Sequence, residues 1–137
     1  MANNTNELTA KLKAAAEKAR WGDWSAYKPH SGARGYEVRV GSEAVAQHCL
    51  KDDAAFIAEA SPKTVLCLIA ALEAAEKRVV ELEASHKKLR EDLAAIHNTI
   101  RLDGLNAPLA AIMSRAKRAH EESATAAGIN LEAGGEA

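Results

Sequence analysis

One stripe of mostly apolar residues runs from Val65 to Ile100 at alternating spacings of three and four. This heptad pattern is typical of helices that coil around one another, and no Gly or Pro interrupts it between Lys63 and Asp103. We call the stripe the seam; its members are Val65, Leu68, Leu72, Ala75, Val79, Leu82, His86, Leu89, Leu93, Ile96 and Ile100. Because packing supplies most helix stability, the uncovered seam predicts self-association.

The residue types along the seam bear on how many chains associate. Val65 with Leu68 and Val79 with Leu82 favour two strands, whereas Leu93 followed by Ile96 favours four. We expect a parallel homodimer, with a tetramer of chains as the alternative.

Charged and polar positions are compatible with a parallel pair. Arg78 would face Glu83 of the partner subunit and Asp92 would face His97 of the partner subunit, so no like charges meet. His86, the one polar member of the seam, is interpreted as a residue that sets register. The alternative is a pH switch, because protonation would place like charges face to face.

Turn-forming residues at 104–108 end the long helix, and a further helix is predicted over 108–126. Its apolar stripe, which includes Leu109 and Met113, also needs a cover. We expect this helix to fold back beside residues 93–100, so that two hairpins form a local four-helix bundle.

The segment before the seam has a different texture, in which aromatic and β-branched residues alternate with turn formers. A three-stranded antiparallel sheet is predicted, and a sheet this small needs helices to cover it. The predicted strands cover 24–28, 36–40 and 44–48, and the predicted helices cover 6–20 and 53–60. Phe56 and Ile57 are expected to face the sheet.

These elements predict an α+β fold that is mostly α. A small N-terminal α-βββ-α domain covers 1–60, a heptad coiled-coil helix covers 61–103, and a C-terminal helix with a frayed tail covers 104–137; together they form an oligomeric bundle. Leu66, Cys67 and Ile69 make the first turns of the long helix apolar nearly all round. We expect the N-terminal domain to dock there.

The composition gives little support for catalysis. With 18 basic and 19 acidic residues the net charge is −1, which excludes a strongly basic nucleic-acid binder. The five His and two Cys show no metal-ligand spacing, and no phosphate loop or nucleophile motif is present. His48 and Cys49 are adjacent on a predicted strand, where neighbours point to opposite faces. We therefore expect no catalytic, cofactor or metal residues, no membrane span, and no enzyme.

Two clusters could recognise a partner. The aromatic residues Trp21, Trp24, Tyr27 and Tyr36 gather in one stretch, and an exposed member would anchor a protein partner. The basic residues Arg115, Lys117 and Arg118 lie on the last helix. Their structural interpretation is a solvated face, and the alternative is a DNA-binding regulator built on a coiled-coil dimer. We otherwise expect no nucleic acid.

Three stretches carry a resemblance to a known family: Leu8–Lys18 (LTAKLKAAAEK), Asp53–Ala58 (DAAFIA) and Ser61–Glu83 (SPKTVLCLIAALEAAEKRVVELE). In this order they resemble the Ead-like accessory early proteins of lambdoid bacteriophages, over about residues 7–83. The resemblance implies an oligomeric phage protein made in the bacterial host cytoplasm, and it offers no catalytic residues that could be carried over. Together with the seam, it suggests a protein that binds a host regulatory or defence protein, in host takeover, lysis–lysogeny modulation or anti-defence.

Overall fold

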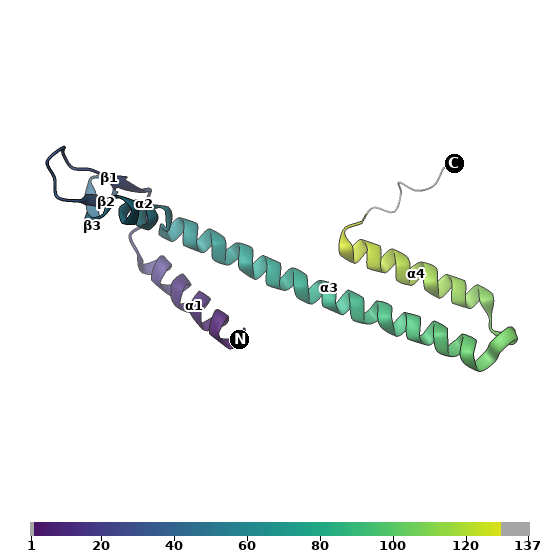
Figure 1. Ribbon diagram of the computed structural model, residues 1–137. Coiled ribbons are helices and arrows are strands. Elements are labelled where there is room, and N and C mark those ends of the chain that lie inside the picture. The colour runs from purple at the N-terminus through teal and green to yellow at the C-terminus, as the bar shows by residue number, and fades with distance from the viewer. Residues whose placement is uncertain (1, 130–137) are drawn as a thin grey trace, which may run out of the picture. The chain divides into compact units, whose positions relative to one another are not determined.

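The computed structural model describes residues 2–129, so most of the predicted C-terminal tail lies outside the described residues. The elements follow in the order α1, β1, β2, β3, α2, α3, a short 3-10 helix and α4 (Figure 1). This confirms the predicted α+β class, mostly helical, with a long helix followed by a C-terminal one. The chain forms two compact units, Met1–Glu73 and Ala74–Ala137, and the boundary between them falls inside α3.

The first unit holds the sheet. Its antiparallel strands β1 (Trp24–Tyr27), β2 (Tyr36–Val40) and β3 (Glu43–Cys49) lie in the spatial order β1-β2-β3. The predicted strands are therefore correct to within one residue at each end. Val38 is fully buried at the centre of β2, where it pairs with Ala26 on one side and Ala46 on the other.

Helix α2 (Lys51–Glu59) contacts all three strands, and its Ala54 is fully buried. Phe56, expected to face the sheet, is instead 73% exposed. Residues two apart on a helix point to different faces, so burying Ala54 turns Phe56 outward. Ile57, three positions after Ala54, is half-buried. The small Ala54 side chain lets α2 approach the sheet closely.

Helix α3 (Pro62–Asp103) has 42 residues and is about 60 Å long. Ser61 caps its start: the Ser61 hydroxyl oxygen lies 3.4 Å from the Thr64 amide and 3.1 Å from the Thr64 hydroxyl. Pro62 occupies the first helical position, where its missing N–H costs nothing. The long, uninterrupted helix predicted from the seam is thus confirmed.

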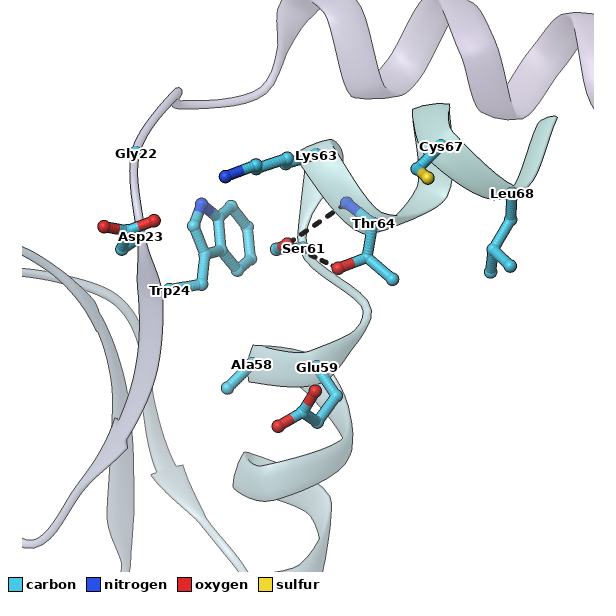
Figure 2. A pocket seen from close by; sticks show the side chains of 10 residues that line it. All are labelled: Gly22, Asp23, Trp24, Ala58, Glu59, Ser61, Lys63, Thr64, Cys67 and Leu68. Atoms are coloured by element: carbon cyan, nitrogen blue, oxygen red, sulfur yellow. Dashed lines mark hydrogen bonds between the residues drawn. The ribbon is translucent and has the colours of Figure 1, made fainter. Parts of the chain in front are cut away.

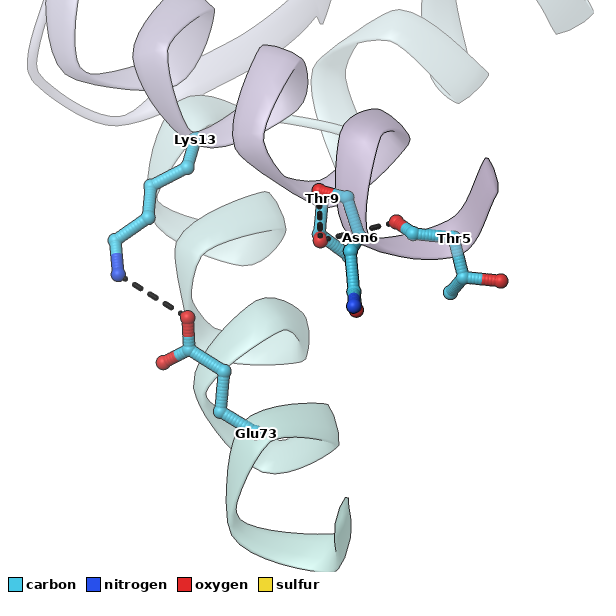
Figure 3. Close-up of polar contacts among 5 residues, drawn as sticks. All are labelled: Thr5, Asn6, Thr9, Lys13 and Glu73. Carbon is cyan, nitrogen blue, oxygen red and sulfur yellow. Dashed lines mark hydrogen bonds and ion pairs between the residues drawn. The ribbon is translucent and has the colours of Figure 1, made fainter. Parts of the chain in front are cut away.

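Helix α1 (Ala2–Lys18) begins four residues earlier than predicted and lies beside the first turns of α3. The Lys13 ammonium lies 3.2 Å from the Glu73 carboxylate, as Figure 3 shows. Ala16 of α1 and Ile69 of α3 are both buried. The predicted docking of the N-terminal domain at Ile69 is therefore confirmed, whereas Cys67 on the next face stays exposed.

The second unit is a helical hairpin. After α3, the 3-10 helix Gly104–Asn106 starts at a left-handed glycine (φ +53°), and α4 (Leu109–Ala127) follows. Gly128, also left-handed, closes α4 by donating its N–H to the Thr125 carbonyl. The predicted return helix is confirmed.

Substituting Gly35 tests how closely its backbone approaches strand β3. It has φ +84°, and an added Cβ would lie 3.0 Å from backbone atoms of His48 and Cys49, which cannot yield easily. Gly41 also has a positive φ, but nothing lies within 4 Å of its added Cβ. We expect Gly41→Ala to cost about 1 kcal/mol of unfolding free energy and Gly35→Ala about 2–3 kcal/mol. Urea unfolding followed by tryptophan fluorescence measures both; equal costs would contradict the close backbone approach.

Candidate protein-interaction surfaces

The seam stays largely uncovered along α3. Its most exposed large members are between 38% and 65% exposed: Leu68, Leu72, Val79, Leu82, Leu93 and Ile100. Ala75 and His86 are exposed as well, and Val65, Leu89 and Ile96 are half-buried. Soluble chains rarely leave such a continuous row of large apolar side chains in water.

Three polar contacts fix α4 against α3. Arg115 Nε donates to Asp92 Oδ1 at 2.8 Å, Lys88 pairs with Glu122, and the Arg78 guanidinium donates to the Ala126 carbonyl near the end of α4. Asp92 is only 7% exposed, so its charge is held by the Arg115 guanidinium inside the contact. Residue numbers fall along α4 as they rise along α3, so the two helices are antiparallel.

These contacts show which side of the seam α4 occupies. Arg78, Ser85, Asp92 and Thr99 are spaced by seven and form the flank directly before the seam's first position in each heptad. Asp92 is buried there, and Ser85 and Thr99 are half-buried. Since α4 covers this flank, Arg78 and Asp92 are engaged within the chain. The predicted pairing of these two residues with Glu83 and His97 of the partner subunit stays a prediction, and it would compete with these contacts.

The contact between α3 and α4 uses small side chains. Ala119 is buried and Ser123 half-buried on α4. Two large apolar residues of α4 stay outside this contact: Leu109 is 68% and Met113 62% exposed. Helical spacing places Leu109 and Met113 on the flank of α4 that adjoins the seam. The hairpin thus presents a two-helix apolar face that also holds Leu93 and Ile100.

Trp24 lies in a separate pocket of the first unit. The pocket has a volume of about 430 Å³ and lies between the start of β1, the end of α2 and the first turns of α3 (Figure 2). Its walls carry Trp24, Leu68 and Cys67 beside the charged residues Asp23, Glu59 and Lys63. The Trp24 indole N–H donates to the Arg20 carbonyl at 2.9 Å, which fixes the ring.

The other predicted aromatic residues do not line this pocket. Trp21 is 66% exposed, and Tyr27 is exposed beneath the Arg39 guanidinium, 4.0 Å from its ring centroid. Tyr36 is half-buried on the central strand, with the Lys28 ammonium 5.6 Å from its ring. Trp21 and Tyr27 are therefore accessible to a partner, whereas Tyr36 packs as part of the sheet.

Two of the three residues in the basic cluster of α4 are paired with acidic side chains. Arg115 is paired with buried Asp92, and Lys117 lies 3.8 Å from Glu121 on the same helix. Arg118 is the one member without an acidic partner among the described residues. A single cation gives weak phosphate affinity, so this arrangement does not favour the DNA-binding alternative.

His48 and Cys49, the residues considered above for catalysis, contact different backbone carbonyl groups. His48 Nδ1 lies 3.4 Å from the Arg34 carbonyl, whereas Cys49 Sγ lies 3.7 Å from the Gln47 carbonyl. Within residues 2–129, no group of three or more His, Cys, Asp or Glu is arranged to hold a metal ion. Over the same residues no single helix is long and apolar enough to cross a membrane; only α2 and α3 together, bent by 54°, meet that length and composition.

Sequence reasoning did not foresee how neighbouring helices flank the seam. The predicted apolar stripe of the last helix holds Ile112 as well as Leu109 and Met113, but in the structure Ile112 is half-buried and the other two are exposed. Sequence reasoning also gave α1 no part at the seam, although Leu12 of α1 and Val65 line one groove. The heptad pattern marks the stripe but carries no information about which flank another helix covers.

The family model described as Ead/Ea22-like protein matches residues 4–131. The match extends well beyond residue 83, where the resemblance noted in the sequence ended, and it includes α4. No curated protein and no solved structure shows significant similarity to the chain.

Proposed function

We propose that this chain, which belongs to the Ead/Ea22-like protein family, is a non-enzymatic phage protein that self-associates and binds a host protein. Membership assigns it to the accessory proteins of lambdoid phages. Its place of action is the host cytoplasm. The partner is a regulatory or defence protein, engaged in host takeover, lysis–lysogeny modulation or anti-defence.

The observation that carries the proposal is the exposed seam. Six large apolar residues of one helix are 38–65% exposed, and two more, Leu109 and Met113, join them on the hairpin. Exposed apolar patches of this kind mark association surfaces. A second copy of the same chain offers the same stripe, and two-fold pairing is the commonest way for identical surfaces to cover each other.

The hairpin affects the form of the assembly. Because α4 covers one flank of the seam beside Asp92, a bare two-stranded coil is not available in the second unit. Two hairpins that pack through their apolar faces make a four-helix bundle, which matches the preference of Leu93 followed by Ile96. We therefore propose a dimer of hairpins, and a tetramer of chains is the competing outcome.

Self-association would give the protein two copies of its small α/β unit. Each copy carries the exposed Trp21 and Tyr27 and the pocket beside Trp24 as candidate anchors for the host protein. Two linked copies bind a multivalent or densely displayed partner more tightly than one, because the second contact is effectively intramolecular. The role proposed for the seam is thus to raise affinity by pairing the binding units.

The test compares binding of the parent chain and Leu82→Asp to the same host protein. The partner is first captured from host lysate with the parent chain, identified by mass spectrometry, and then coated densely on a surface. We expect the variant to bind on the order of 100-fold more weakly, because avidity is lost. Ala84→Asp, which adds the same charge away from the seam, should bind as the parent does. Equal binding by Leu82→Asp would contradict the role of pairing.

A further inference from the structure

A small apolar groove lies between α1 and the start of α3. It has a volume of about 190 Å³, and its walls include Leu12, Ala15, Ala16 and Ala19 from α1 and Val65 from α3. None of the residues that line it is charged. A charged or strongly polar ligand would therefore lose hydration there without gaining a partner. The groove suits one aliphatic side chain.

The position of α1 identifies the flank of the seam on which the groove opens. Val65, Ile69 and Glu73 are four residues apart and share one face of α3. Val65 lines the groove, Ile69 is 5% exposed, and Glu73 pairs with Lys13 of α1 (Figure 3). Helix α1 thus covers the flank of the seam that Ile69 and Glu73 form, on the side of α3 opposite to the flank of Arg78 and Asp92.

Leu68 is the most exposed of the large apolar side chains of the seam, at 65%. In a parallel pair of heptad helices, a side chain at its heptad position inserts between four residues of the facing helix. For Leu68 these are Val65, Leu68, Ile69 and Leu72 of the other copy. Two of the four, Val65 and Ile69, are those that α1 lies against. The inserted Leu68 would therefore reach the mouth of the groove.

We propose that the groove receives Leu68 from a second copy of this chain, which makes α1 part of the dimer interface. The proposal rests on the self-association proposed above and deepens it. Each copy supplies one exposed Leu68 and one groove, so a two-fold axis satisfies both at once. Val65 belongs to the seam and to the groove wall, so the groove continues the seam sideways. The same contact removes the exposed faces of Leu12 and Leu72 from water.

Cysteine cross-linking between two distinguishable chains tests this contact. In a background of Cys49→Ser and Cys67→Ser, one tagged chain carries Leu12→Cys and an untagged chain carries Leu68→Cys. The chains are co-expressed, purified by the tag and oxidised with copper phenanthroline. We expect the disulfide between residues 12 and 68 to form at least tenfold more than in a control with Ala14→Cys, which lies on another face of α1. Circular dichroism of each chain should match the parent's.

The outcomes separate the two proposals. Cross-linking of residue 12 to residue 68 above the Ala14 control supports the groove contact. If a separate preparation in which both chains carry Leu68→Cys forms the 68–68 disulfide, while residue 12 does not cross-link to residue 68 above the Ala14 control, the parallel dimer stands and the groove contact is overturned. If neither disulfide forms and the parent chain has the mass of a monomer, both the groove contact and the proposed self-association are overturned.

Discussion

Changing Leu82 to Asp is expected to convert the associated chain into a monomer at micromolar concentration. Leu82 is 40% exposed at the seam, so each copy would bury it on association. Fully burying a leucine side chain contributes about 1.5–3 kcal/mol, so burying the 40% of Leu82 that is still exposed contributes roughly 0.6–1.2 kcal/mol, and the two-fold pair loses this twice. A carboxylate at the same place would in addition be desolvated without a partner. Together these effects weaken association by at least about a thousandfold, since each 1.4 kcal/mol is tenfold.

Light scattering coupled to size-exclusion chromatography measures the mass of each variant. Ala84→Asp is the matched control: it adds one negative charge two residues away, where α3 is exposed and off the seam. We expect the control to keep the mass of the parent chain. A parent chain that is monomeric at micromolar concentration, or an equal loss of mass in both variants, would contradict the seam as the association surface. A parent mass of four chains would select the tetramer.

Changing Arg115 to Met is expected to destabilise the hairpin more than any other change to its polar contacts. Asp92 is 7% exposed, and Arg115 is its hydrogen-bonded charge partner at 2.8 Å. Removing Arg115 leaves a buried carboxylate uncompensated, which costs about 3–5 kcal/mol for fully buried pairs. Because the Arg115 side chain is 43% exposed, we expect the lower end of that range.

Replacing both residues of the pair separates the effect of the buried charge from the effect of lost packing. Replacing both partners, as Asp92→Leu with Arg115→Met, should recover most of the lost stability, because no charge is then left buried. Arg118→Met, three residues along α4, should have an effect of less than about 0.5 kcal/mol. Urea unfolding followed by circular dichroism measures all three. The proposed role of the pair fails if Arg118→Met costs as much as Arg115→Met, or if the double change is no better than the single one.

Short-range patterns predicted much of the fold. The alternation in Tyr36–Val40 and the turn at Gly41 fixed the sheet, and the heptads fixed α3, because both depend on neighbours along the chain. Phe56 was misplaced because its orientation depends on how closely α2 approaches the sheet. That distance is set by the small Ala54, which hydrophobicity alone ranks below Phe56.

The candidate surfaces were only partly predictable for the same reason. The seam was visible as a pattern, but the charged residues beside it were assigned to a partner subunit. In the structure, Asp92 and Arg78 contact α4 of their own chain. The heptad spacing predicts that charged residues on a flank of the seam have charge partners. It does not indicate whether the same chain or another chain supplies them. The groove beside Leu12 depends on two segments about fifty residues apart, so no local pattern marks it.

The boundary between the two units falls within an unbroken helix, and this limits how the chain can change in length there. Each residue added to α3 rotates everything after it by about 100° around the helix axis. An insertion of two residues near Glu73 would turn the later part of the stripe to the far side, whereas an insertion of seven would keep it nearly in phase. Relatives with a longer α3 are therefore expected to differ from this one by whole heptads.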